Sequence, residues 1–192
     1  MSESDYENSL EDQLLIAMPQ LADPYFAHTV TYLWKHNKDG ALGIVINQPL
    51  TISVADIFDE LEIVCSVDDT AFKNRRVLAG GPVERDKGFI IHDSSNDWNS
   101  SVRVGERFSL STSKQLLQDI ADGKGPERYL IALGCAGWDG GQLDRELSEN
   151  AWLTAPATAE LVFSEDFENM AARAAEQLGV DLNQLSPDAG HS

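Results

Sequence analysis

The segment from Ala41 to Ile46 is an almost unbroken run of aliphatic residues. A run of this length with turn signals on both sides predicts a strand that is buried in the centre of a sheet. The residues before it, Asn37-Lys38-Asp39-Gly40, are typical of a hairpin turn, and Pro49 ends the strand soon afterwards. Because a central strand needs neighbours on both sides, the chain must supply several more strands.

The other apolar segments alternate between strand-like and helix-like patterns. Strands are expected at 14–18, 29–34, 76–79, 88–91, 103–110 and 129–133, and late strands around Trp152 and at 161–163. Helices are expected after Ser53 and Ser113, around Leu143 and Leu147, and over 167–178. Several connections are too short for a parallel crossover. The pattern therefore predicts an α+β fold, a single domain with a mixed β-sheet flanked by about four helices.

The length of 192 residues is enough for one domain with its own core. Residues 1–12 contain five acidic residues and no basic one, so we expect a flexible acidic N-terminus. The folded domain is expected over 13–182, with a C-terminal tail at 183–192.

Charge and cysteine usage exclude several classes of protein. The 14 basic and 32 acidic residues give a net charge of −18, so the average field repels phosphate backbones and anionic membranes. Direct nucleic-acid binding and membrane association are therefore not expected. The two cysteines lack metal-ligand spacing, and neither a P-loop nor a GxGxxG motif is present. We expect a cytoplasmic protein with neither metal nor cofactor, whose oligomeric state the sequence leaves open.

The most suggestive segment for chemistry is Gly134 to Gly141, which follows a predicted buried strand. A cysteine that leaves a strand just before a glycine-rich turn, as Cys135 does, has the position of a nucleophile. The other interpretation is that Cys135 is a small buried hydrophobic residue and that the glycines allow close packing. Of the four histidines, His92 at the end of a strand has the best position for a general base.

Two further patterns have weaker implications. Gly80-Gly81-Pro82 could approach a ligand closely but lacks the residues of a phosphate-binding loop. Ser111-Thr112-Ser113-Lys114 matches an SxxK pattern, but its companion motifs are absent, so Ser113 is interpreted as a helix cap.

An ordered series of short motifs resembles the YqgE/AlgH family over roughly residues 13–182. The motifs are Ala17-Met18-Pro19, His36-Asn37, Gly40 to Pro49, Gly80-Gly81-Pro82-Val83, Gly88 to His92, Ala136-Gly137-Trp138, Gly141-Gln142-Leu143 and Asn150 to Leu153. The resemblance implies an α+β fold in bacterial proteins of unestablished activity, some labelled transcriptional regulators of alginate synthesis. The chain departs from the family pattern at Gly134-Cys135 and at Asn169-Met170-Ala171.

The sequence leaves three functions open. The leading hypothesis is a regulatory protein that binds a protein or small ligand, with Gly80, Gly81, Pro82, Gly137, Trp138, Asp139 and Gln142 as candidate contact residues. The second is a thiol-dependent hydrolase or transferase that uses Cys135 and His92. The third is a redox-responsive switch that uses Cys65 and Cys135. Whether the chain is an enzyme is not decided by its sequence.

Overall fold

The computed structural model describes residues 9–19, 21, 26–94, 98 and 100–185. The chain divides into two compact units. The first unit consists of the residues up to Asn47 together with those from Ala136 onward, and the second unit runs from Gln48 to Cys135. Strand β9 (Tyr129–Asp139) begins in the second unit and ends in the first.

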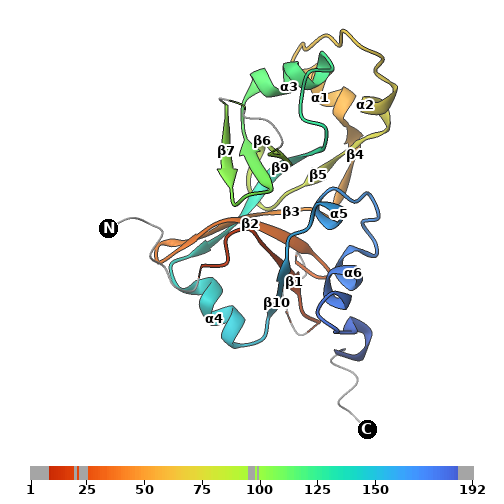
Figure 1. The fold of residues 1–192 in the computed structure, drawn as a ribbon. Helices are drawn as coiled ribbons and strands as arrows, with labels where there is room; N and C mark the ends of the chain where they lie inside the picture. The colour runs from red at the N-terminus through yellow and green to blue at the C-terminus, as the bar shows by residue number, and fades with distance from the viewer. Residues whose placement is uncertain (1–8, 20, 22–25, 95–97, 99, 186–192) are drawn as a thin grey trace. The chain divides into compact units, whose positions relative to one another are not determined.

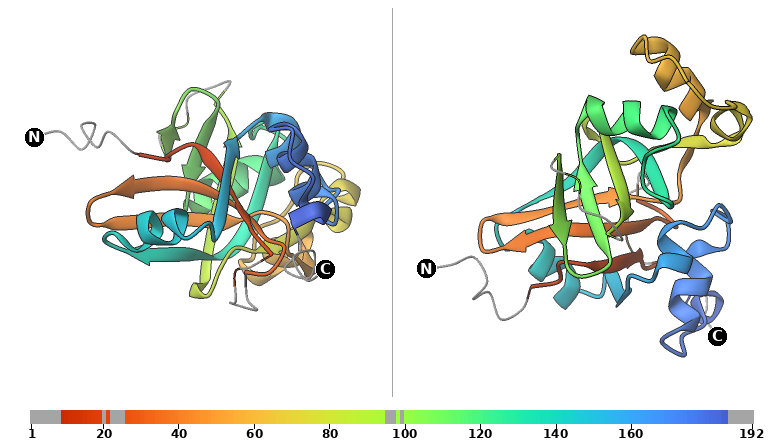
Figure 2. Two further views of the ribbon diagram at one scale, coloured as in Figure 1. Left: turned by 90° about the horizontal axis from the view of Figure 1, so that it is seen from below. Right: turned by 45° about the horizontal axis from the view of Figure 1, so that its top comes forward.

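The sheet of the first unit has antiparallel neighbours throughout. Its order is β10 (Trp152–Pro156), β1 (Gln13–Ala17), β2 (Val30–Asn37), β3 (Gly40–Val45) and the C-terminal end of β9. Figure 2 shows the long β2–β3 hairpin with the end of β9 beside it. The predicted hairpin turn lies where it was expected, because Asn37 pairs with Gly40.

The register of this sheet separates its two faces. His36 pairs with Ala41, and Ala41 pairs with Trp138, so these three side chains share one face. Helix α4 (Gln142–Ser148) packs there, since Leu143 belongs to the same buried cluster as Ala41 and Trp138. Helix α6 (Met170–Glu176) contacts β1 and β10 (Figure 1).

The second unit builds its sheet on the first half of β9. Strand β6 (Val83–Asp93) pairs antiparallel with β9, and β8 (Phe108–Ser111) and β7 (Ser101–Val104) follow outward from β6. Strand β5 (Arg76–Ala79) runs parallel to β9 and pairs with β4 (Pro49–Ser53). The parallel β5–β9 pair makes the sheet mixed, as predicted.

The helices of the second unit cover an apolar core. Ser53 begins α1 (Val54–Glu60) with a capping box, in which its hydroxyl accepts from the Asp56 amide and the Asp56 carboxylate accepts from the Ser53 amide. Ser113 caps α3 (Lys114–Ala121) through the amide of Gln115, as expected. Phe58, Phe72 of α2 (Thr70–Asn74), Ile90, Leu116 and Ile131 belong to the buried cluster that joins helices and strands.

Two predictions of secondary structure are corrected by the observed helices. The described residues contain six α-helices and one 3-10 helix (Leu182–Leu185), where about four helices were expected. Residues 161–163 form no strand, because Thr158 caps the short helix α5 (Ala159–Val162) with its hydroxyl on the Leu161 amide. None of the described helices is both long and apolar enough to cross a membrane.

Candidate functional site

Cys135 lies inside strand β9 rather than at the end of a strand. Strand β9 continues to Asp139, so the segment predicted as a glycine-rich turn is extended backbone as far as that residue. The Cys135 side chain is buried and its thiol is free. Burial, with a smaller contribution from Glu84, raises the pKa of this thiol, so the thiolate needed for nucleophilic attack is disfavoured.

His92 and Cys135 are not brought together by the fold. His92 on β6 pairs with Tyr129 on β9, and Cys135 lies six residues further along β9. At ~3.3 Å per residue the two residues are separated by about 20 Å. Direct proton transfer between these two side chains is therefore excluded in this arrangement.

His92 instead contacts a serine that the sequence analysis did not single out. The His92 side chain is fully buried, and its Nε2 lies 2.7 Å from Ser101 Oγ. Its Nδ1 lies 2.6 Å from the carbonyl oxygen of Asp93. Because a carbonyl oxygen can only accept, Nδ1 carries the ring proton, and Nε2 accepts from the Ser101 hydroxyl. Burial lowers the pKa of His92, although Asp93 acts in the opposite direction.

The glycines of the Gly80-Gly81-Pro82 segment have a packing role. A Cβ built on Gly80 would lie 2.3 Å from the carbonyl oxygen of Gly134, and one on Gly134 would lie 2.4 Å from that of Gly81. Gly134 also has a φ of +80°, which side-chain-bearing residues rarely adopt. Gly80 and Gly81 are buried, whereas Pro82 is exposed. Close backbone approach therefore explains these glycines, and ligand contact by this segment stays a prediction.

In the first unit, the ring of Trp138 belongs to a cluster of aromatic residues. It stacks on Phe26 at a centroid distance of 6.2 Å and meets Trp152 edge-on at 5.8 Å. The indole nitrogens of Trp138 and Trp152 both donate to Glu146 Oε1, at 3.3 and 3.0 Å. The Trp138 side chain therefore holds α4 against the sheet.

Gln142, at the start of α4, links the helix to the end of β9. Its side-chain amide donates to Glu146 Oε2 at 3.2 Å, and its Oε1 accepts from the Asp139 amide at 3.0 Å. Gly137 and Asp139 are exposed on β9, whereas Gln142 is half-buried. These contacts do not test whether the four predicted residues also bind a partner.

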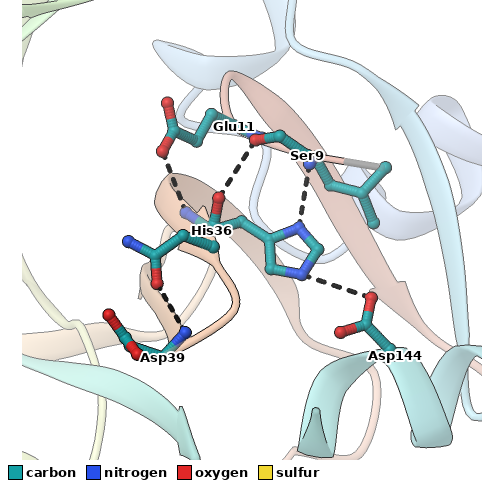
Figure 3. Close-up of polar contacts among 7 residues, drawn as sticks. Ser9, Glu11, His36, Asp39 and Asp144 are labelled. Carbon is teal, nitrogen blue, oxygen red and sulfur yellow. Dashed lines mark hydrogen bonds and ion pairs between the residues drawn. The ribbon is translucent and has the colours of Figure 1, made fainter. Parts of the chain in front are cut away.

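A second buried histidine, His36, ties the start of the described chain to the end of β2 (Figure 3). Its Nδ1 accepts from the Leu10 amide at 2.9 Å, so the ring proton must lie on Nε2. Nε2 faces Asp144 Oδ1 at 3.4 Å. The backbone of His36 also bonds to side chains, since its amide donates to Glu11 and its carbonyl accepts from Ser9.

A cavity of about 250 Å³ lies along the β2–β3 hairpin in the first unit. It is lined by Lys35, Asn37, Asp39, Gly40, Ala41, Leu42 and Trp138. An irregularity in the β2–β3 pairing between Leu33 and Lys35 lets both Leu33 and His36 face α4, while Lys35 pairs with Leu42 on the opposite face. Asn37 is held in place because its Oδ1 accepts from the Asp39 amide at 2.9 Å.

Comparison with known proteins identifies the family of this chain. A family model described as AlgH-like (DUF179) matches residues 14–183. The chain belongs to the AlgH-like family. This AlgH-like chain is 46% identical to a UPF0301 protein of Alcanivorax borkumensis over 186 residues, which cover 96% of the chain and 98% of that protein. It is 44% identical to a UPF0301 protein of Idiomarina loihiensis over 96% of the chain and the whole of that protein.

Solved structures support the same assignment. The solution structure of the AlgH protein from Pseudomonas aeruginosa is 43% identical, has a TM-score of 0.77, and is matched over 100% of this chain and 99% of that one. A crystal structure of a Corynebacterium diphtheriae protein is 16% identical with a TM-score of 0.75, and covers 95% of this chain and 94% of that one. The second likeness concerns the fold alone. The resemblance to the YqgE/AlgH family is thus confirmed. Membership of this family does not assign an activity to the chain.

Sequence reasoning on this AlgH-like chain missed Ser101 and His36. Ser101 is nine residues from His92 in sequence and reaches it only because β8 pairs with both β6 and β7. Ser101 lies at the end of a segment, 93–101, that was interpreted as polar loop, whereas it is the first residue of β7. His36 was noted in a family motif but not as a site residue. In the described part of the chain, no group of three or more His, Cys, Asp or Glu residues is arranged to hold a metal.

Proposed function

We propose that this protein binds a small anionic molecule in the cavity along the β2–β3 hairpin and acts as a regulatory binding protein in the bacterial cytoplasm. The observation that carries the proposal is the cavity itself, which combines the exposed Lys35 ammonium, the side chain of Asn37 and the apolar surface of Leu42. Such a combination of apolar lining and a few polar groups is typical of ligand sites.

The cavity is lined by one charged group of each sign, and Lys35 is the group that can hold an anion. Lys35 lines the cavity and is paired with no described carboxylate, whereas the chain as a whole carries a net charge of −18. Asp39 also lines the cavity and weakens the positive potential. A compact ligand with a single carboxylate or phosphate, placed next to Lys35, suits this balance better than a polyanion.

The size of the cavity limits the ligand further. Its 250 Å³ lie just below the ~300–1,000 Å³ that drug-sized ligands occupy. A small metabolite fits this volume better than a dinucleotide. Two of the predicted contact residues, Gly137 and Asp139, lie on β9 next to the cavity strand β3, because they pair with Leu42 and Gly40.

The alternative of a thiol-dependent enzyme finds less support. Cys135 is buried, its pKa is raised, and its distance from His92 leaves it without the proposed base. The redox-switch hypothesis stays open, since both Cys65 and Cys135 are free thiols.

A fragment screen by NMR tests the proposal directly. The ¹⁵N-labelled full-length protein is titrated with a library of small carboxylates and phosphate monoesters, and amide shifts are followed. We expect hits to move the amides of residues 37–42, and the Lys35→Ala variant to bind the same hits about tenfold more weakly, which corresponds to ~1.4 kcal/mol.

Lys38→Ala provides the matched control, because Lys38 is exposed on the same hairpin but does not line the cavity. This variant should bind like the parent protein. The proposal fails if no compound at millimolar concentration moves the amides of 37–42, or if Lys35→Ala binds every hit unchanged.

A further inference from the structure

Strands β6, β8 and β7 place a set of polar side chains on one face of the second unit. His92 pairs with Ser109, and Ser109 pairs with Arg103, so these three residues share that face. Ser101 lies two residues before Arg103 on β7 and therefore points to the same side. A serine hydroxyl, an imidazole and a guanidinium are thus neighbours on one sheet surface.

The hydrogen-bond pattern distinguishes Ser101 from the other serines of this surface. Ser109 Oγ bonds to Ser94 Oγ at 2.9 Å, and Ser111 Oγ donates to the Ser100 carbonyl at 2.9 Å. Among the described serines, only Ser101 has its Oγ hydrogen-bonded to a histidine nitrogen, at 2.7 Å from His92 Nε2. That nitrogen carries the lone pair of the neutral ring, so the bond has the direction needed to remove the hydroxyl proton.

The histidine is itself held in this orientation from two sides. The carbonyl oxygen of Asp93 fixes the proton on Nδ1, and the ring of Trp98 meets the imidazole edge-on at a centroid distance of 5.3 Å. The carboxylate of Asp93 is engaged elsewhere, since it accepts from the Arg128 amide at 2.7 Å. A nucleophile, a base and a group that orients the base are the three parts of a hydrolytic serine site.

We propose that Ser101 is a nucleophilic serine activated by His92, in a site that accepts small carboxylic esters. Ser101 is partly exposed at the start of β7, whereas His92 is fully buried beneath it, so substrate reaches the hydroxyl and not the base. Arg103, exposed about 7 Å along the same face, donates to the Ser94 carbonyl at 3.2 Å and places a cation that can attract a substrate carboxylate. This site lies in the second unit and does not depend on the proposed function of the cavity.

The reaction balances with water as the co-reactant. Ser101 Oγ attacks the ester carbonyl carbon while its proton moves to His92 Nε2. The bond to the alcohol oxygen then breaks, and the alcohol leaves with that proton. Water attacks the acyl-serine, passes one proton to His92 Nε2, and the carboxylic acid departs as Ser101 Oγ recovers its proton.

A fluorophosphonate probe tests the serine in the folded full-length protein. The probe loses fluoride when a serine oxygen attacks its phosphorus atom, and peptide mass spectrometry locates the adduct. We expect the adduct on Ser101, its loss in Ser101→Ala, and labelling about 100-fold slower in His92→Gln, because a general base contributes about 10²–10⁴-fold. The parent protein should also release p-nitrophenol from p-nitrophenyl acetate, and Ser101→Ala should not.

Two controls keep the test decisive. Ser100→Ala removes a hydroxyl one residue away and should label like the parent protein, because the Ser100 contact to Ser111 uses its backbone. If His92→Gln does not fold, the pH profile of the parent protein replaces it. Because burial lowers the pKa of His92, labelling should stay constant from pH 8 to 6.5 and fall in more acidic solution. Absence of a Ser101 adduct, or a rate that neither His92→Gln nor acid reduces, overturns the proposal.

Discussion

The two buried histidines in the described part of the chain have nearly the same burial but opposite tautomers. His36 in the first unit is 2% exposed and accepts at Nδ1, whereas His92 in the second unit is 0% exposed and donates at Nδ1. The partner of Nδ1 decides which nitrogen keeps the lone pair. His36 therefore directs its proton toward the carboxylate of Asp144, and His92 directs a lone pair toward the hydroxyl of Ser101.

The difference assigns different roles to two residues of the same type. His36 joins three parts of the first unit, namely residues 9–11, β2 and α4, and its contacts are those of a structural tether. The His92 ring is oriented by the hydrogen bond of its Nδ1, and its Nε2 can accept a proton. Acid–base chemistry requires this arrangement.

The largest effect is expected when His92 is replaced by phenylalanine. His92→Phe removes both hydrogen bonds of a fully buried ring and leaves the carbonyl of Asp93 and the hydroxyl of Ser101 without this partner. We expect the free energy of unfolding to fall by about 3 kcal/mol, measured by urea denaturation. The exposed His28 gives the control His28→Asn, which should change it by less than ~0.5 kcal/mol, because Asn tolerates the φ of +62° at this position. An equal loss of unfolding free energy in the His92 and His28 variants would show that the buried histidine contributes no more than the exposed one.

A smaller effect is expected for His36→Leu, because the backbone bonds of residue 36 to Ser9 and Glu11 survive the substitution. The Leu10 amide loses its acceptor, and the free energy of unfolding should fall by about 2 kcal/mol. Hydrogen exchange of the Leu10 amide measures the local part of the effect and should become faster. Unchanged exchange at Leu10 would show that His36 does not hold the N-terminal segment.

The smallest effect is a pH dependence that belongs to His92. Burial lowers the pKa of His92 in the folded protein, so below pH ~6.5 the unfolded chain binds more protons at this residue than the folded one. Stability from this source is complete above that pH and is lost as the pH falls toward the folded pKa. Between pH 7 and 5.5 we expect the free energy of unfolding of the parent protein to fall more than that of His92→Gln. If the free energy of unfolding of the parent protein and of His92→Gln depended on pH in the same way, this prediction would be wrong.

Local patterns predicted most of the strands and several helices, since these depend on apolar periodicity and caps that lie within a few residues. The failures have identifiable causes. The apolar run Leu161-Val162-Phe163 suggested a strand, but Thr158, three residues before Leu161, caps a helix that begins at Ala159. The glycines after Leu133 suggested a turn, but Gly134 allows the β9 backbone to pass close to Gly81 and β9 continues to Asp139.

The candidate sites were harder to predict because each depends on strand register. The Ser101–His92 contact follows from two successive strand pairings, and the His36 group joins residues 27 and 26 positions apart in sequence. No local spacing encodes such distances. The pairing of Cys135 with His92 was a reasonable hypothesis from residue types, and only the β6–β9 register separates them.

The division of β9 between the two units has a consequence for biosynthesis. Strand β3 leaves the ribosome long before its partner β9, and β1 long before its partner β10, because Ala136 follows Asn47 by 89 residues. At about 5–20 residues per second, this interval lasts several seconds. The second unit is contiguous from Gln48 to Cys135 and has all its strands as soon as the first half of β9 emerges. A nascent chain therefore completes the second unit first and the sheet of the first unit last. Until the end of β9 has emerged, the edge of β3 is open to chaperones.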